Sequence, residues 1–224
     1  IQNLINTVYK EEVMRKNAEI EALQAQINPH FLYNTLDSIN ALAELKGVDE
    51  VSQITVAFSK LLRASISNGK KIVTLEEEIK YISNYMTIIK IRFNNKIMFI
   101  TDIQEETLSC LLPKLIIQPI VENSVVHGLE GRKAEGRIEI KSWLEGEFLI
   151  IRVADNGIGM EEKVLGEYQQ KDTGDDRHTR IGLKNVKKRI QLMYGSEYDV
   201  EICSKKGEGT SVTIKLPKQY EFKE

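Results

Sequence analysis

The chain passes from an apolar run to an acid and two glycines in the stretch Phe148-Leu149-Ile150-Ile151-Arg152-Val153-Ala154-Asp155-Asn156-Gly157-Ile158-Gly159-Met160. A buried strand that ends in this way is suited to hold a flat, polar ligand, because the Asp155 carboxylate accepts a hydrogen bond from an exocyclic amine. We expect Gly157 and Gly159 to have positive φ and to let the ligand approach the backbone closely. The alternative is an ordinary hairpin turn, for which Asp-Asn-Gly is also typical.

An upstream segment, residues 118–128, favours the ligand site. It is predicted to be a helix stopped by glycine, and it carries the carboxylate of Glu122, the amide of Asn123 and the imidazole of His127. Asn123 and His127 are four residues apart and therefore share one helix face. Because an amide oxygen suits a Mg²⁺ ion that is shared with phosphates, Asn123 is the predicted metal ligand.

Two downstream segments contain glycines that fit the same pocket. Gly182 and Leu183 open an amphipathic basic stretch, and we expect a helix there whose N-terminus receives phosphate. Gly209 and Thr210 lie between two alternating runs, which predicts a hairpin beside the ligand's base. Each segment alone has a structural explanation, since asparagines cap helices and glycines end them. Their occurrence together predicts one nucleotide pocket.

The order of these segments resembles the N, G1, G2 and G3 boxes of the GHKL ATP-binding domain, in the form found in sensor histidine kinases. The residues upstream resemble the phosphoacceptor box of LytS/YesM-type histidine kinases, and they read Gln26-Ile27-Asn28-Pro29-His30-Phe31-Leu32-Tyr33-Asn34-Thr35-Leu36. The similarity extends through Leu75-Glu76-Glu77-Glu78 and Ile91-Arg92-Phe93. It implies ATP and Mg²⁺ as cofactors, transfer of the γ-phosphoryl group to His30, and onward transfer to an aspartate of a response regulator receiver domain.

The imidazole of His30 is chemically suited to this role, since neutral imidazole is a nucleophile near pH 7. Asn34, one turn later, and Glu122 are the candidates to orient or deprotonate it. Pro29 removes a helical hydrogen bond and should kink or loosen the helix beside the nucleophile. The alternative is a buried, satisfied core histidine at a helical kink.

The chain departs from the family pattern at four positions. Val126 stands where a lysine is common, Arg180 where a glycine is common, and Phe31 where many histidine kinases have an acid. In ATP-hydrolysing GHKL proteins a glutamate one turn before the asparagine activates water, and here that residue is Pro119. The resemblance therefore favours transfer to a side chain over hydrolysis. Two other functions stay open, a GHKL ATPase or serine kinase and a non-catalytic dimeric scaffold.

The expected fold is α+β. Residues 1–46 and 51–67 show helical periodicity, broken at Gly47-Val48-Asp49, and predict an antiparallel helical hairpin with Ile54, Ala57, Phe58, Leu61 and Leu62 inward. A hairpin cannot cover its own apolar faces, so we expect a homodimer through a four-helix bundle. We assign residues 1–94 to this dimerisation and phosphotransfer region and 95–224 to the catalytic domain.

The second region is predicted to be a two-layer α/β sandwich of GHKL ATPase type. Thr74 and Glu77 form a predicted capping box for a helix over 75–92. We expect strands over 97–103, 137–144, 147–154, 200–204 and 211–216, and helices at 118–128 and 183–193. Residues 160–180 have little apolar periodicity, and the resemblance makes them a loop that closes over the nucleotide, with Arg177, His178 and Arg180 near the phosphates. The alternative is a solvated surface loop.

Composition agrees with this interpretation. A formal net charge of −2 over 224 residues gives no electrostatic case for nucleic acid. Cys110 and Cys203 lie far apart and fit no metal-site spacing, which indicates a reducing compartment. The chain begins with Ile1 and has no run of eighteen apolar residues, so we expect a fragment or a processed chain that does not itself span a membrane. The resemblance implies that membrane-spanning helices lie upstream and that this chain is a cytoplasmic domain of a membrane protein.

Overall fold

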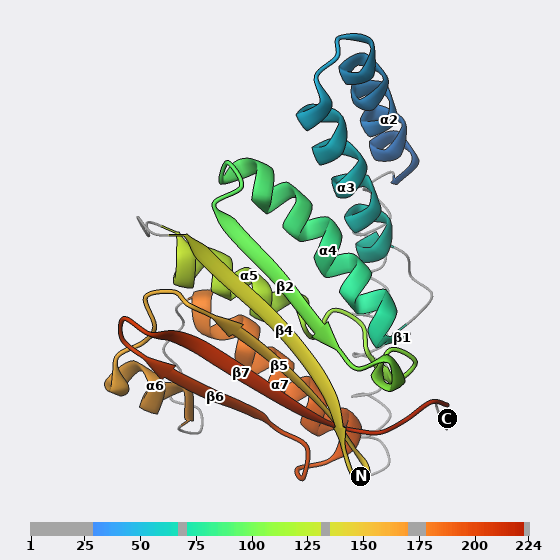
Figure 1. Ribbon diagram of the computed structural model, residues 1–224. Coiled ribbons are helices and arrows are strands. Elements are labelled where there is room, and N and C mark those ends of the chain that lie inside the picture. The colour runs from blue at the N-terminus through green and yellow to red at the C-terminus, as the bar shows by residue number, and fades with distance from the viewer. Residues whose placement is uncertain (1–28, 67–70, 131–134, 170–177, 222–224) are drawn as a thin grey trace, which may run out of the picture. The chain divides into compact units, whose positions relative to one another are not determined.

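The computed structural model describes residues 29–66, 71–130, 135–169 and 178–221 (Figure 1). The chain forms two compact units, which divide between Ser59 and Lys60. None of the helices in the described ranges is long and apolar enough to cross a membrane.

The first described residues form a helical hairpin, and the first unit ends within its second helix. Helix α2 spans Pro29–Leu45, Gly47 has φ +66 in the connection, and α3 spans Asp49–Ile66. Ala43 and Ala57 are buried, and the Ser52 hydroxyl donates to Asn40 Oδ1 over 2.7 Å. The predicted hairpin and its break are confirmed. The expected helical stretch before Pro29 lies outside the described residues.

One residue of α3 differs from the prediction. Phe58 was expected to face inward, but it is 47% exposed in the single chain. It joins other exposed apolar side chains of the hairpin, which are Phe31, Ile39, Leu42, Leu45, Val48, Val51 and Val56. The hairpin buries only part of its apolar surface, because two helices offer each other one face each.

After the last turns of α3, the second unit continues with β1 (Ile72–Thr74) and α4 (Leu75–Arg92). The predicted capping box is confirmed: the Glu77 amide donates to Thr74 Oγ1 over 3.2 Å, and the Thr74 amide donates to Glu77 Oε2 over 3.1 Å. The buried residues of α4 follow a spacing of three or four, and they are Leu75, Glu78, Ile82, Met86 and Ile89. Helix α4 therefore belongs to the same compact unit as the sheet. The predicted boundary between a phosphotransfer region (residues 1–94) and a catalytic domain (residues 95–224) stays a prediction about function.

A five-stranded mixed sheet forms one of the two layers of the second unit, and helices form the other. Its order is β2-β4-β5-β7-β6, with β2 parallel to β4 and all other pairs antiparallel. The strands are β2 (Ile97–Ile103), β4 (Gly136–Glu145), β5 (Phe148–Asp155), β6 (Val200–Lys205) and β7 (Gly209–Pro217). The predicted strands are confirmed to within one or two residues at each end.

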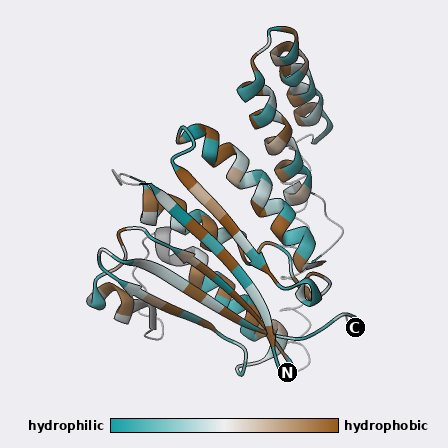
Figure 2. Ribbon diagram, viewed as in Figure 1, coloured by the Kyte–Doolittle hydropathy of each residue, from teal (hydrophilic) through white to brown (hydrophobic). Residues whose placement is uncertain are grey.

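Short elements and further helices complete the second unit. These are the 3-10 turn η1 (Glu105–Thr107), β3 (Leu111–Pro113), α5 (Gln118–Asn123), the π-helix η2 (Ser124–Leu129), α6 (Glu162–Gln169) and α7 (His178–Tyr194). The sequence patterns did not predict the pairing of β1 with β3, which are three residues each. Helices α5 and α7 lie behind the sheet in Figure 1. Ile138, Ile140, Leu149 and Ile151 are fully buried and form part of the core with α4, α5 and α7. Apolar and polar residues alternate along β4 in Figure 2, as a sheet with one covered face requires.

The segment 160–180 was predicted wrongly in part. A loop was expected, but Glu162–Gln169 form α6, and α7 begins at His178 instead of residue 183. Both stretches are polar, so their helical periodicity is hidden from a pattern that counts apolar residues. Residues 170–177 lie outside the described ranges, so the expected position of Arg177 near the phosphates stays a prediction.

Candidate nucleotide site

A cavity of about 280 Å³ lies where α5, η2, α6 and α7 meet the ends of β5 and β7. Its walls are mostly apolar, with a few polar groups, as is typical of a small-molecule site. The lining residues are Ile120, Asn123, Ser124, His127, Gly128, Asp155, Ile158, Gly159, Met160, Val164, Leu183, Thr210 and Val212. Its volume suits the flat base of a nucleotide.

The carboxylate of Asp155 is held from three segments. Ser124 Oγ donates to Oδ2 over 2.9 Å, and the Gly157 and Thr210 amides donate to Oδ1 over 2.8 Å and 3.3 Å. Because all three partners are donors, they favour the ionised, acceptor form of the side chain. Asp155 pairs with Ile138 and Thr210 in the sheet, so the stretch 155–157 is not a hairpin turn.

Glycines let the backbone segments around Asp155 approach one another. Gly159 has φ +62 and Gly209 has φ +110, and a Cβ at either position would overlap a backbone carbonyl, that of Lys205 or of Asp155. Positive φ was also expected at Gly157, and this expectation was wrong. Gly157 is needed for space instead, because a Cβ there would overlap the backbone of Gly128.

Gly128 does not stop its helix as expected, because η2 continues to Leu129. A Cβ at Gly128 would lie 2.9 Å from Asp155 Oδ1, so this glycine makes room for the carboxylate. In the wider π-helical turn, residues four apart still share one face, and both Asn123 and His127 line the cavity. π-Helical turns are frequent at functional sites.

Asn123 has a buried side-chain Nδ2 with no hydrogen-bond partner among the described residues. Gly182 of α7 lies beside it, since a Cβ on Gly182 would be 3.6 Å from this atom. A buried donor without a partner is costly in a folded protein, which indicates a site that an acceptor on a ligand completes.

Gly182 was predicted to lie at the N-terminus of its helix, and this prediction was wrong. It is the fifth residue of α7, which begins at His178.

Most predicted nucleotide residues meet at this cavity. Asn123, His127, Asp155, Gly159, Leu183 and Thr210 line it, while Gly157, Gly182 and Gly209 lie against residues that do. Glu122 does not line it. Its Oε1 accepts a hydrogen bond from Gln118 Nε2 over 2.8 Å, and its charge helps burial to raise the pKa of Tyr85 to about 12.

Sequence reasoning missed several lining residues. Ser124 was overlooked although it follows Asn123 directly, because its function depends on a carboxylate 31 positions away. Val164 was missed because α6 was expected to be loop. Ile120, Ile158, Met160 and Val212 supply apolar walls, and their proximity to the predicted polar residues in the sequence was the available signal.

In the hairpin unit, His30 is exposed at the start of α2, and Asn34 Nδ2 lies 3.2 Å from its Nδ1. The alternative of a buried core histidine is therefore wrong. Pro29 is the first described residue, so the expected kink falls at the edge of the described range.

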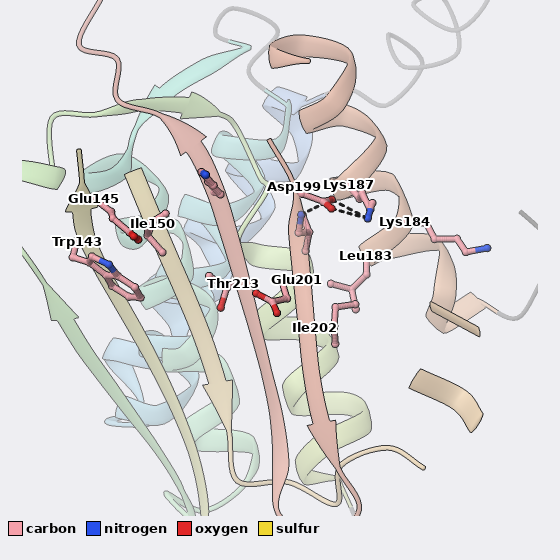
Figure 3. Close-up of a pocket in the computed structure, with 12 residues that line it drawn as sticks. Trp143, Glu145, Ile150, Leu183, Lys184, Lys187, Asp199, Glu201, Ile202 and Thr213 are labelled. Carbon is pink, nitrogen blue, oxygen red and sulfur yellow. Dashed lines mark hydrogen bonds and ion pairs between the residues drawn. The ribbon is translucent and has the colours of Figure 1, made fainter. Parts of the chain in front are cut away.

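A larger cavity, of about 540 Å³, extends along the sheet to α7 (Figure 3). Trp143, Ile150 and Lys215 line it, together with the ion pair between Lys187 Nζ and Asp199 Oδ1, which are 2.8 Å apart. Its charged side chains include both signs. Apart from Leu183, the predicted nucleotide residues do not line it.

Two family models match the chain. Residues 18–97 match the histidine kinase family, and residues 111–220 match the histidine kinase-, DNA gyrase B- and HSP90-like ATPases. The second match establishes an ATP-binding domain. It covers every residue that lines the 280 Å³ cavity.

Full-length relatives agree. The sensor histidine kinase YesM of Bacillus subtilis is 39% identical over 97% of this chain, YpdA of Escherichia coli is 34% identical over 92%, and the sensor protein LytS of Streptococcus agalactiae is 33% identical over 89%. The chain spans about a third of the length of these relatives, namely 36%, 35% and 34%.

A solved structure supports the fold. The nucleotide-free catalytic domain of the histidine kinase ThkA matches 66% of this chain and 96% of its own length, with a TM-score of 0.50 and 19% sequence identity. The chain therefore shares its fold with this catalytic domain. With the phosphoacceptor-type segment at His30 and the cavity at Asp155, the chain belongs to the sensor histidine kinases of two-component systems, in their LytS/YesM-type group.

Proposed function

We propose that this chain is a kinase core that transfers the γ-phosphoryl group of ATP to His30 and then supplies it to an aspartate of a response regulator. The observation that carries the proposal is the cavity at which the triply held carboxylate of Asp155 and the unpartnered amide of Asn123 lie together. The first group suits the base of ATP, and the second suits its phosphate end.

Asp155 reads the base. Its carboxylate accepts and does not donate, so it pairs with the exocyclic amine of adenine and rejects a purine that presents a carbonyl there. Ser124, Gly157 and Thr210 hold the acceptor in place, which avoids its reorganisation on binding. ATP is therefore preferred over GTP.

Asn123 and His127 serve the phosphate side. Asn123 fits a Mg²⁺ site because its side chain lines the cavity and an amide oxygen is a hard ligand. When bound, Mg²⁺ neutralises charge on the phosphates and orients them for in-line attack. His127 is exposed on the adjacent turn and adds a donor toward the phosphate oxygens.

His30 is the proposed nucleophile. A bond forms between an imidazole nitrogen and the γ-phosphorus, the bond from that phosphorus to the bridging oxygen of ADP breaks, and the ring proton passes to a base. A half-turn of the Asn34 amide would place Oδ1 toward Nδ1, where it accepts the ring N–H and leaves the Nε2 lone pair for attack. We propose Asn34 as the orienting residue and Glu122 as the base.

Assembly follows from the hairpin. Its exposed apolar residues, such as Phe58, Leu42 and Leu45, fit a four-helix bundle between two copies, so we propose a homodimer. We further propose that the receiver domain of a response regulator is the next partner, that no nucleic acid is bound directly, and that an upstream part attaches the chain to a membrane.

Labelling with γ-³²P-ATP and Mg²⁺ tests the proposal. Wild-type protein should retain label through alkali and lose it in acid, as expected for phosphohistidine. His30→Ala should lose the label and keep its ATP affinity within about threefold, or roughly 0.6 kcal/mol. His127 and His178 are the other two histidines of the chain, so acid-labile label that persists in His127→Ala and in His178→Ala, even at a reduced amount, assigns the phosphohistidine to His30. Label that persists in His30→Ala would overturn the assignment, and acid-stable label would indicate a serine kinase.

A further inference from the structure

Glu78 is a buried carboxylate that the proposed reaction does not use. It lies on α4, is 0% exposed, and has Leu75 and Ile82 of the core as neighbours along its helix. Removing a carboxylate from water is expensive unless hydrogen bonds compensate for the loss. The groups that hold Glu78 therefore indicate what it does.

The partners of Glu78 are backbone amides of one short loop. Leu115 N–H donates to Oε2 over 2.8 Å, and Ile117 N–H donates to Oε1 over 3.0 Å. The amides of Ile116 and Gln118 also stabilise the carboxylate. Burial raises the pKa of Glu78, and these backbone hydrogen bonds oppose the rise. Successive amides that converge on one anion form a nest, and here the chain's own side chain fills it.

This loop is strained and is held from two sides. Leu115 has φ +60, a left-handed conformation that costs a non-glycine residue roughly 1 kcal/mol or more. On the other side, Arg189 of α7 donates from Nη1 to the Lys114 carbonyl over 2.6 Å. The loop connects β3 to α5, so these contacts determine where α5 begins.

Helix α5 begins at Gln118 and passes at Asn123 directly into the π-helix η2, which ends at Leu129. A helical segment this short has little internal stability, and its position depends on what holds its ends. Gln118, at its first position, contacts Glu122. A displacement of the loop would therefore move both Glu122 and Asn123.

We propose that Glu78 is a positioning residue of the nucleotide site: by anchoring the amides that precede α5, it places Asn123 at the phosphate side of the cavity. This inference rests on the proposed ATP site. This role explains why a carboxylate is buried where an apolar side chain would pack. The nest of loop amides then binds the protein's own Glu78 side chain and not a phosphate.

The test compares Glu78→Gln with Ile82→Ala, which removes a fully buried side chain one turn later on the same helix. Glu78→Gln keeps the volume but turns an N–H toward the loop amides. Three quantities are measured: the thermal midpoint, the Kd for ATP with Mg²⁺ and with chelator, and hydrogen exchange over residues 115–123.

Glu78→Gln should weaken Mg²⁺-dependent ATP binding roughly tenfold, as for other residues that orient a metal ligand, and should speed exchange at Leu115 and Ile117. Ile82→Ala should lower the midpoint without either effect. Equal changes of affinity in both variants, or unchanged exchange in Glu78→Gln, would overturn the inference. If wild-type protein binds no ATP, the proposed function fails, and the exchange data still decide whether Glu78 positions α5. Should Glu78→Gln not fold, Glu78→Asp keeps the charge on a shorter side chain and should show the same effects in weaker form.

Discussion

Ser124 Oγ donates a hydrogen bond to Asp155 Oδ2 over 2.9 Å, and this contact joins the helical layer to the sheet at the cavity. Ser124 lies on η2 directly after Asn123, and Asp155 ends β5. The groups that we propose to read the base and to bind the ion are therefore linked through one short segment. A shift of α5 and η2 would disturb both.

Replacement of Asp155 by alanine should remove base selection. The loss of an ionised acceptor predicts a decrease in ATP affinity of roughly 1.5–3 kcal/mol, measured by calorimetric titration. Ser124→Ala keeps the carboxylate and should lose less, roughly 0.5–1.5 kcal/mol. Wild-type protein should prefer ATP, and equal binding of ATP and GTP would contradict the role of Asp155.

Asn123→Ala should abolish the Mg²⁺ dependence of nucleotide binding, because the protein offers few ligands to an ion that the phosphates share. Titrations with Mg²⁺ and with chelator measure this dependence. Asn84→Ala is the control, since the Asn84 amide donates to the Lys80 carbonyl within α4. If Asn123→Ala kept normal Mg²⁺-dependent binding, Asn123 would be a structural residue of its helix.

Leu61→Glu should give monomers and reduce His30 labelling together. Leu61 is half-buried on α3, near Phe58, which is 47% exposed, so a charge there would disrupt an apolar seam. Sedimentation and labelling are measured on the same samples. Lys60→Glu, at an exposed neighbouring position on another helix face, should change neither. A wild-type protein that is monomeric and fully active at high concentration would rule out the dimer.

The alkaline stability of the protein should depend on Tyr85. Burial is the main cause that raises the pKa of Tyr85 from 10.0 to about 12, and the negative charge of Glu122 adds to the rise. Between these values the unfolded chain has released the proton and the folded chain keeps it, so the free energy of unfolding falls as pH rises. Tyr85→Phe should flatten this fall, as measured by denaturant titrations over that pH range.

Glu122→Gln provides a second test of the same coupling. Removal of the negative charge should lower the pKa of Tyr85, whereas Tyr194, whose pKa is raised to about 12 by burial, should not respond. Tyrosinate absorbance during alkaline titration reports both groups. An unchanged titration in Glu122→Gln would place Glu122 too far from Tyr85 to interact.

Local sequence determined most helices and strands of this protein and predicted most of the polar residues that line the 280 Å³ cavity. Thr74 and Glu77 predicted the start of α4, because a capping box uses groups three residues apart. The alternation around Gly209 predicted the hairpin of β6 and β7, in which Thr210 lies opposite Ser204, because a strand's side chains repeat every second residue. Neighbours in the chain carry this information.

Tertiary structure alone decided how distant segments fit together. Glycine is needed at position 128 because a Cβ there would overlap the side chain of Asp155, and at position 157 because a Cβ there would overlap the backbone of Gly128. No local conformational preference reveals either requirement. The hydroxyl of Ser124 and the carboxylate of Glu78 acquire their roles from groups 31 and 37 residues away. Side-chain periodicity describes which face of an element is buried, but the contacts made across that face depend on packing in three dimensions.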